Sequence, residues 1–271
     1  MNGAEVRAAL HSGRRVYGTC IASTSPLWPK VVTQLGIDFV FICTEHFPIS
    51  RDTLSWMCQT YKALNLAPIV RIPEPDPYRA EMVLDGGASG IIAPYVETPE
   101  QVQALRGALK LRPLKGKRRD DFLAGRAELE PELARYLADW NADNVLVVNV
   151  ESRPAVEALD EILSVPQLDA VLVGPHDLSL SLGIPEQYDH PEFDRTVRTI
   201  IRKAREHGVG VGIHFWADVE RQLSWAADGA NFIVHGTDMT KFGSTMKGDF
   251  AALRRALGDE VGPSEDREAV V

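Results

Sequence analysis

Cysteine is scarce in this chain, and its spacing indicates no disulfide framework. The 271 residues contain only Cys20, Cys43 and Cys58, without a CxxC pair or a Cys/His finger spacing. This odd, unpaired set argues against a disulfide scaffold and against a structural zinc site. Residues 1–13 lack an apolar signal core and predict a short amphipathic helix. We therefore expect reduced thiols in a cytoplasmic protein.

Several sequence signatures of other protein classes are also missing. No apolar run approaches the roughly 20 residues of a membrane span, so we expect no membrane segment. The sequence contains no GxGxxG or Walker loop and no GxSxG elbow. No lysine follows an apolar strand-like run, so a Schiff-base mechanism lacks its nucleophile.

Positive charge is in deficit, with 29 Lys and Arg against 38 Asp and Glu and a net charge of -9. Non-specific nucleic-acid binding depends on basic surface, so we expect no nucleic-acid partner. The chain is 45% hydrophobic and 25% charged, which is ordinary for a globular protein. Its length is near that of one α/β barrel and predicts a single domain over 1–271.

Short apolar runs alternate eight times with helical patterns along the chain. Continuous apolar runs are typical of parallel strands that are buried on both faces. We expect strands at 16–21, 39–43, 67–70, 90–93, 145–150, 170–173, 209–213 and 232–234. We expect helices at 28–35, 50–64, 76–84, from 98 onward, and at 153–163, 190–206, 219–227 and 250–257. This alternation predicts a closed (β/α)8 TIM barrel.

The interval 111–144 interrupts the alternation with a charged stretch and a helical pattern. It predicts either a solvated loop-helix insertion or a lid or subunit contact near the rim of the barrel. The tail from residue 258 is polar, and we expect it to be loose.

Polar clusters follow four of the predicted strands. They are Glu45 with His46, Arg71, Glu151, and the turn Gly174-Pro175-His176-Asp177. In a parallel barrel the carboxyl ends of the strands share one rim, where the active sites of such barrels lie. The sequence therefore predicts an active site that combines two carboxylates, a fixed cation and an imidazole.

Glu151 and Asp177 are candidates for a shared metal ion. Carboxylate oxygens on adjacent strand tips suit Mg²⁺ or Mn²⁺ better than a structural zinc. Both residues stand just before helical segments, so helix capping is the alternative. The Gly174-Pro175 turn favours a ligand site, because bare backbone lets an anion approach its amides.

The other polar residues each allow two interpretations. His46 suits a general base or a polar rim position, and Glu45 could orient it. Arg71 suits the stabilisation of developing oxygen charge or an ion pair with Glu45. Asp85 is either a helix-end residue or reaches the site of a neighbouring subunit, and His214 is at most a residue that lines the pocket.

Six motifs, taken together, resemble the HpcH/HpaI family of class II pyruvate aldolases. They are TEHFP (44–48), VRIP (70–73), LDGGASGIIAPYVET (84–98), NVES (149–152), VGPHDLSLSLG (173–183) and GANFIVHGTD (229–238). Single motifs are weak, but their order and intervals over residues 15–255 make the resemblance specific.

The resemblance implies a barrel of the phosphoenolpyruvate/pyruvate type, usually a hexamer built as a trimer of dimers. It implies a divalent metal, Mg²⁺ or Mn²⁺ with Co²⁺ as a further option, held by Glu151 and Asp177. The Gly174–Asp177 turn would then bind the substrate carboxylate through Gly174, Pro175, His176 and Asp177. The implied substrate is a small oxo acid.

The resemblance also implies residue roles in a carbon–carbon cleavage. Arg71 would steady the enolate oxygen, His46 would transfer a proton together with a water molecule, and Asp85 would contribute from a neighbouring subunit. The implied reaction cleaves a 4-hydroxy-2-oxo acid to pyruvate and an aldehyde. A lyase acting on another oxo acid or an acyl-CoA is the alternative, as is a catalytically weak oxo-acid-binding homologue.

Three positions depart from the family pattern. Cys43 stands where many members have the Asp that pairs with the catalytic histidine, and Glu45 could substitute for it. The segment KGKRRDDFLAGRAE (115–128) replaces the usual glycine-rich, arginine-containing stretch. His176 occupies a position that is often small. Known substrates are therefore not carried over to this chain.

Overall fold

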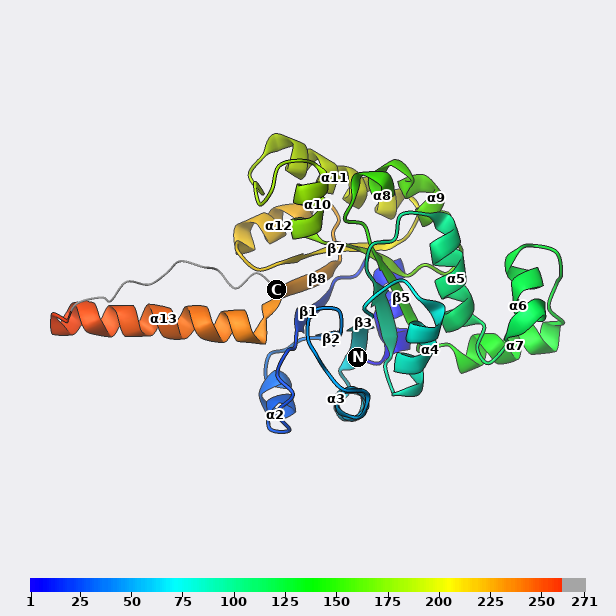
Figure 1. Cartoon of the computed structure of the whole chain (residues 1–271), viewed down its shortest axis with the longest axis horizontal. Coiled ribbons are helices and arrows are strands. Elements are labelled where there is room, and N and C mark those ends of the chain that lie inside the picture. Colours follow the sequence, from blue (N-terminus) through cyan, green and yellow to red (C-terminus); the bar gives the residue numbers. More distant parts are fainter. Residues whose placement is uncertain (260–271) are drawn as a thin grey trace.

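The computed structural model describes residues 1–259, and eight parallel strands form a closed barrel in the order of the sequence (Figure 1). The predicted (β/α)8 barrel is confirmed. The strands are β1 (Val16–Cys20), β2 (Phe39–Cys43), β3 (Ala67–Arg71), β4 (Gly90–Ala93), β5 (Val145–Asn149), β6 (Ala170–Val173), β7 (Gly210–Phe215) and β8 (Phe232–Thr237). The polar tail predicted from residue 258 lies outside the described residues from residue 260 onward.

Six of the strands, β2 to β7, are buried along their whole length because two separate cores cover their two faces. Phe39, Phe41 and Phe232 belong to the core inside the barrel, where Phe39 and Phe232 stack with ring centroids 4.7 Å apart. Val40 and Ile42 belong to the core between the strands and the surrounding helices. This double burial explains the continuous apolar runs in the sequence.

Helices surround the barrel, and most begin at a capping side chain or a proline. Those that follow the expected pattern are α1 (Gly3–His11), α2 (Trp28–Val32), α3 (Arg51–Ala63), α4 (Pro77–Asp85), α5 (Pro99–Lys110), α11 (Pro191–Glu206) and α12 (Val219–Ala227). The segment predicted as a turn after the sixth strand continues into a short helix that was not expected, α10 (Pro175–Ser181). Helix α1 packs Val6 and Leu10 into the interior core and closes the end where the strands begin.

Two helical predictions need correction. The helix expected over 153–163 is divided into α8 (Arg153–Glu157) and α9 (Leu159–Leu163). The closing helix expected over 250–257 is the end of the 20-residue α13 (Asp238–Leu257). A capping box of Thr237 and Thr240 starts α13 twelve residues early, because local capping outweighs the helix-weakening glycines Gly243 and Gly248.

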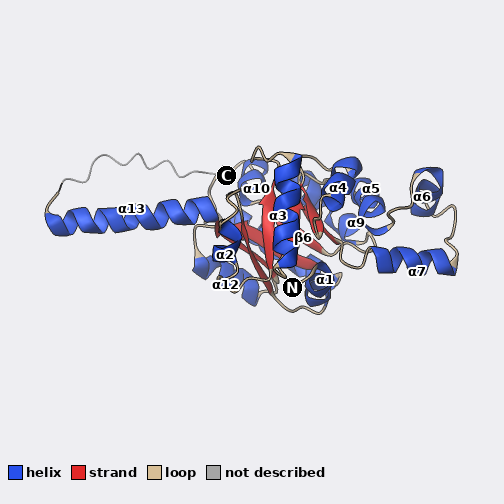
Figure 2. Cartoon of the chain, turned by 90° about the horizontal axis from the view of Figure 1, so that it is seen from below, coloured by secondary structure: helices blue, strands red, loops and turns tan. Residues whose placement is uncertain are grey.

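The insertion forms α6 (Gly116–Leu123) and α7 (Pro131–Trp140), and its ends lie where the strands begin. Lys110 at the end of α5 donates to the main-chain oxygen of Asn144, which directly precedes β5. Both views show the insertion and α13 extending from opposite sides of the barrel (Figures 1 and 2). The prediction of a lid over the chain's own rim is wrong, because an αβ connection emerges at the opposite end of the barrel from the active-site rim.

In the part of the chain that the structure describes, no helix is long and apolar enough to traverse a bilayer.

Candidate active site and metal centre

The ends of β2 and β3 bring Glu45, His46 and Arg71 together at the predicted rim. The register pairs Cys43 with Arg71, so the residues after β2 lie beside the Arg71 side chain. Arg71 Nε lies 2.9 Å from Glu45 Oε2, and its Nε and Nη2 donate to Cys43 Sγ at 3.3 and 3.1 Å. The predicted ion pair with Glu45 is confirmed. Within residues 1–259 the Arg71 hydrogen bonds and ion pair involve only Nε and Nη2, so its Nη1 group can donate to an anionic ligand.

His46 lies at the edge of the same cluster. Its Nε2 is 3.7 Å from Glu45 Oε2, and its main-chain N–H donates to Cys43 Sγ. Burial and the Arg71 charge lower the pKa of His46 below its ordinary value of 6.5. The imidazole is therefore neutral at pH 7 and can accept a proton.

Glu151, directly after Val150 at the end of β5, is buried with 2% of its surface exposed. The main-chain N–H of Tyr95 donates to Oε1 at 2.7 Å, and Asn149 Nδ2 donates to Oε2 at 2.7 Å. Burial raises the pKa of Glu151 to about 7, although both donors act to lower it. Each carboxylate oxygen keeps a second lone pair for a further ligand.

Gly174 makes room for this carboxylate. A Cβ atom at Gly174 would lie 2.0 Å from Glu151 Oε2, far inside contact distance. The requirement for glycine here is therefore steric, since its φ of -86° is open to any residue. This close approach brings the first turn of α10, which carries Asp177, against Glu151.

Asp177 faces the same space as Glu151. The Tyr95 hydroxyl donates to Asp177 Oδ1 at 3.4 Å, and the Asp177 charge contributes to the raised pKa of Glu151. The ion pairs at this rim join Glu45 to Arg71 and to His46 and, within residues 1–259, involve neither Glu151 nor Asp177. Two adjacent carboxylates without a counter-ion fit a divalent cation.

The donor set for such a cation is small. No group of three or more His, Cys, Asp or Glu side chains that could hold a metal occurs within residues 1–259. Asn149 Oδ1 is buried and has no hydrogen-bond partner in that part of the chain. Two carboxylates with open coordination positions are typical of Mg²⁺, which retains water and substrate oxygens.

The alternative role of helix capping does not hold for the two acids. Ser152 caps α8 by accepting from the main-chain N–H of Ala155, and Glu151 takes no part. Gly174 occupies the cap position of α10, and Asp177 lies inside its first turn. Both carboxylates are thus free of the structural task that the sequence could not exclude.

The remaining predicted substrate contacts divide between the rim and the interior. Pro175 and His176 begin α10 beside Asp177, and His176 Nδ1 lies 3.5 Å from Glu186 Oε1. His214 lies within β7 instead of after it, and its Nε2 is 3.2 Å from the main-chain oxygen of Gly236. Burial lowers the pKa of His214 to about 4, so this imidazole is uncharged at pH 7 and lies in the barrel interior beneath the rim.

Asp85 is not part of the cluster in its own chain. It ends α4, at the end of the barrel where the strands begin, and forms an ion pair with Arg112. The structural interpretation of Asp85 as a helix-end residue is thereby supported for one chain. Its contribution to the site of a neighbouring subunit stays a prediction.

Tyr95 and Asn149 are site residues that the sequence analysis missed. Tyr95 lies two residues after the end of β4, and Asn149 is the last residue of β5. The position of Tyr95 just after a predicted strand was the one feature of the sequence that could have indicated a place at the rim. Asn149 has no such feature, because it lies inside an apolar run.

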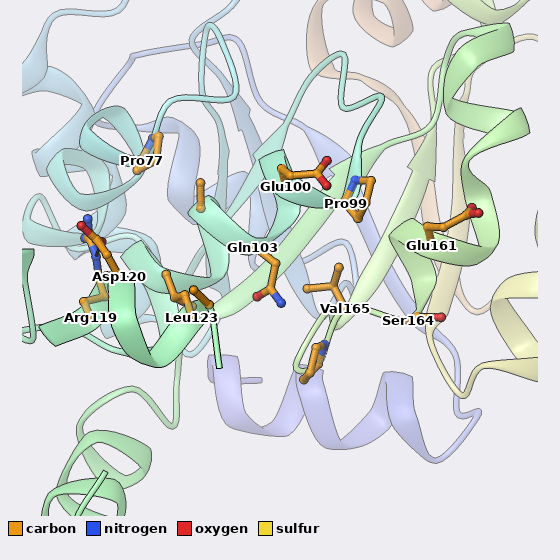
Figure 3. Close-up of a pocket in the computed structure, with 13 residues that line it drawn as sticks. Pro77, Pro99, Glu100, Gln103, Arg119, Asp120, Leu123, Glu161, Ser164 and Val165 are labelled. Atoms are coloured by element: carbon orange, nitrogen blue, oxygen red, sulfur yellow. Dashed lines mark hydrogen bonds and ion pairs between the residues drawn. The ribbon is translucent and has the colours of Figure 1, made fainter. Parts of the chain in front are cut away.

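Two surface hollows lie away from this cluster. One of about 610 Å³ lies between α5, α6 and α9, where Gln103, Leu123 and Val165 face one another (Figure 3). The other, of about 720 Å³, lies between α2 and the first turns of α13 and is lined by Trp28 and Phe242 among others. Neither contains a predicted site residue, so the site rests on the chemistry of the rim.

Comparisons with known proteins identify the family of the chain and agree with its fold. The model of the family described as HpcH/HpaI aldolase/citrate lyase matches residues 17–244. The 2-keto-3-deoxy-L-rhamnonate aldolase of Escherichia coli (strain K12) is 33% identical over 239 residues, which cover 88% of each chain.

Two solved structures are also similar. The citrate synthase SbnG is 28% identical with a TM-score of 0.78, covering 93% of this chain and 98% of that one. The citrate lyase beta subunit from M. tuberculosis, complexed with oxaloacetate and magnesium, is 16% identical with a TM-score of 0.54 and shares the fold. That match covers 84% of this chain and 93% of the other.

Proposed function

The chain belongs to the HpcH/HpaI aldolase/citrate lyase family, and from that premise we propose that it cleaves a 4-hydroxy-2-oxo acid to pyruvate and an aldehyde. By class it is a carbon–carbon lyase of the aldolase type. The E. coli relative is named for a 2-keto acid without oxygen at carbon 3, which is the proposed substrate class. The aldehyde half of the substrate is left open.

One observation carries the proposal. The carboxylates of Glu151 and Asp177 form no ion pair within residues 1–259, and the guanidinium of Arg71 lies at the same rim. Glu151 is buried and Asp177 is close enough to raise its pKa, so the pair favours an added cation. We propose that these residues hold Mg²⁺ or Mn²⁺, with Co²⁺ as a substitute. When bound, the cation would polarise the carbonyl and neutralise the charge that develops on its oxygen.

The protein's own residues would perform the remaining steps. His46, neutral at pH 7, would accept the proton of the C4 hydroxyl directly or through one water molecule. The C3–C4 bond would then break, with its electron pair forming the C2–C3 double bond of an enolate and the negative charge moving to the C2 oxygen. Arg71 would stabilise that oxygen, and a proton returned to C3 would give pyruvate.

Pyruvate release, coupled to lactate dehydrogenase, tests this function. A panel of 4-hydroxy-2-oxo acids would be assayed with Mn²⁺ and with excess chelator, using Glu151→Gln as the matched inactive control. We expect pyruvate only in the metal-supplemented wild type. Undiminished activity after complete removal of the metal would contradict the proposal.

The similarity to a citrate synthase favours a second candidate on the same fold. In this alternative the substrate is another oxo acid or an acyl-CoA thioester, and the same cation site and Arg71 act on its enolate. Screening acyl-CoA compounds beside the 4-hydroxy-2-oxo acids separates the two. Product formed only with an acyl-CoA would favour this second candidate.

We also propose that the protein forms a homo-oligomer, a hexamer arranged as a trimer of dimers. Helix α13 has no buried residue, and Met239, Phe242, Phe250 and Leu253 on it are all at least 49% exposed. The hollow beside α2 lies next to the first turns of α13, at the position where the last helix packs in a regular barrel. A second copy's α13 would cover both apolar surfaces. Light scattering that gives the mass of one chain would contradict this arrangement.

The cytoplasm is the proposed location. The three cysteines are free and buried, as expected in a reducing compartment. Cell fractionation with an antibody against the chain would test it.

A further inference from the structure

Tyr95 contacts both proposed metal ligands, each with a different group. Its main-chain N–H donates to Glu151 Oε1 at 2.7 Å, and its hydroxyl donates to Asp177 Oδ1 at 3.4 Å. Glu151 follows β5 and Asp177 lies in α10, after β6. A single residue on the loop between β4 and α5 therefore joins two carboxylates from different strand ends.

Tyr95 makes these two contacts from an unusual backbone conformation. Its φ is +47°, a left-handed conformation that is rare for a large side chain. The angle φ sets the direction of a side chain relative to its own N–H, so this value decides where the phenol lies once the N–H faces Glu151. Strain of this kind persists where the surroundings impose it, and it gathers at functional sites.

We propose that Tyr95 is a positioning residue of the metal site, which holds the carboxylates of Glu151 and Asp177 in place for a divalent cation. This inference rests on the proposed function and adds a residue to it. The N–H contact fixes the buried acid, and Asn149 holds its other oxygen. The contact from the hydroxyl to Asp177 is longer and therefore weaker. It orients the Asp177 carboxylate and leaves lone pairs on its oxygens for a cation.

Tyr95→Phe is the sharpest test, because it removes the hydroxyl and keeps the ring and the main-chain donor. Free Mn²⁺ would be measured by electron paramagnetic resonance in a titration of the full chain. We expect the Mn²⁺ Kd to rise roughly fivefold, below the 10-fold to 100-fold typical of tighter outer contacts to metal ligands. Thermal unfolding without metal should be unchanged, and KM for the substrate at saturating Mn²⁺ should stay within error of the wild type.

Tyr78→Phe is the matched control, since Tyr78 is 80% exposed at the start of α4 and contacts neither acid. Its Mn²⁺ Kd should equal that of the wild type. A Tyr95→Phe protein that binds Mn²⁺ as tightly as the wild type overturns the inference and leaves the proposed function standing. A wild type that binds no Mn²⁺ overturns the metal site of the proposed function and this inference with it.

Discussion

The two ends of the barrel each contain a buried carboxylate, and the two carboxylates differ in their partners. At the rim, Glu151 receives two neutral N–H donors, and burial raises its pKa to about 7. At the opposite end, Asp169 is fully buried between Lys110, Arg7 and His11. Burial opposes its charge, but the Lys110 and Arg7 charges and the hydrogen bond with His11 hold the pKa of Asp169 at about 2.

The difference in partners indicates different roles: Asp169 is a structural acid with counter-ions, and Glu151 is an acid without an ion-pair partner. Asp169 connects α1 to β6, and its Oδ2 also accepts from the main-chain N–H of Leu146 at 2.8 Å, so its charge is balanced inside the protein. Glu151 forms no ion pair within residues 1–259, and the nearby charge of Arg71 does not offset its burial, so its pKa stays raised. A buried acid that the chain leaves without a counter-ion is therefore the stronger sign of a ligand site.

Removing the unbalanced acid should have the largest effect on activity and a small one on stability. Glu151→Gln should lower kcat/KM by about 10³-fold, since the cation supplies several kcal/mol of charge stabilisation. At pH 4.5, its free energy of unfolding without metal should differ from that of the wild type by less than about 1 kcal/mol, because glutamine resembles the protonated acid. Steady-state kinetics and urea unfolding measure both, and a stability loss that matches the activity loss would contradict the comparison.

The balanced acid should behave in the reverse way. Asp169→Asn leaves Lys110 buried without its carboxylate, which should cost about 3 to 5 kcal/mol of stability. Activity at 15 °C, where the folded fraction is still high, should change little. Urea unfolding and kinetics on the same sample check this, and Asp160→Asn, an exposed acid paired with Lys203, is the matched control.

The two acids should also give opposite pH dependences of stability in metal-free protein. The folded-state pKa of Glu151, about 7, is above its ordinary 4.5, so the native state binds more protons between these values. Stability should fall by up to about 3 kcal/mol as pH rises through that window. Asp169 has a lowered pKa, so its contribution is present above about pH 4 and is lost as pH falls toward 2.

Urea unfolding at a series of pH values, with Glu151→Gln beside the wild type, isolates the first slope. The variant should lack the decline between pH 4.5 and 7. An identical decline in both proteins would assign the slope to other groups.

The smallest effect is expected at Cys43, where the family more often has an acid. Glu45 already lies 3.7 Å from the His46 imidazole and 2.9 Å from Arg71 Nε. Cys43→Asp should therefore change turnover less than about fivefold, the equivalent of roughly 1 kcal/mol for a half-exposed ion pair. A much larger increase would instead support the catalytically weak homologue, whose histidine lacks its carboxylate.

The barrel and most of the site could be predicted because they depend on local patterns. Apolar runs such as 39–43 mark buried parallel strands, and a polar residue directly after a run, as with Arg71, marks the rim. Contacts across the barrel left no such pattern. Lys110, at the end of the helix expected from residue 98, is buried beside Asp169, which the helical pattern does not indicate.

The features that the sequence did not predict depend on main-chain geometry and on the end of the barrel at which a loop emerges. Tyr95 acts through a left-handed φ and a main-chain N–H, which residue type does not reveal. One of the two interpretations of 111–144 places it near the rim because it lies between strands four and five, but the insertion follows α5 and so emerges at the opposite end. The early start of α13 depends on the capping pair Thr237 and Thr240, and the glycines inside the helix weaken the helical pattern in the sequence.

A crystal structure with Mn²⁺ and pyruvate is the most direct measurement of the central claim. We expect anomalous density for one Mn²⁺ between Glu151 and Asp177, with pyruvate beside it and the Arg71 guanidinium facing the pyruvate ketone oxygen. A Mn²⁺ ion bound elsewhere, or the two carboxylates turned apart with no density between them, would contradict it.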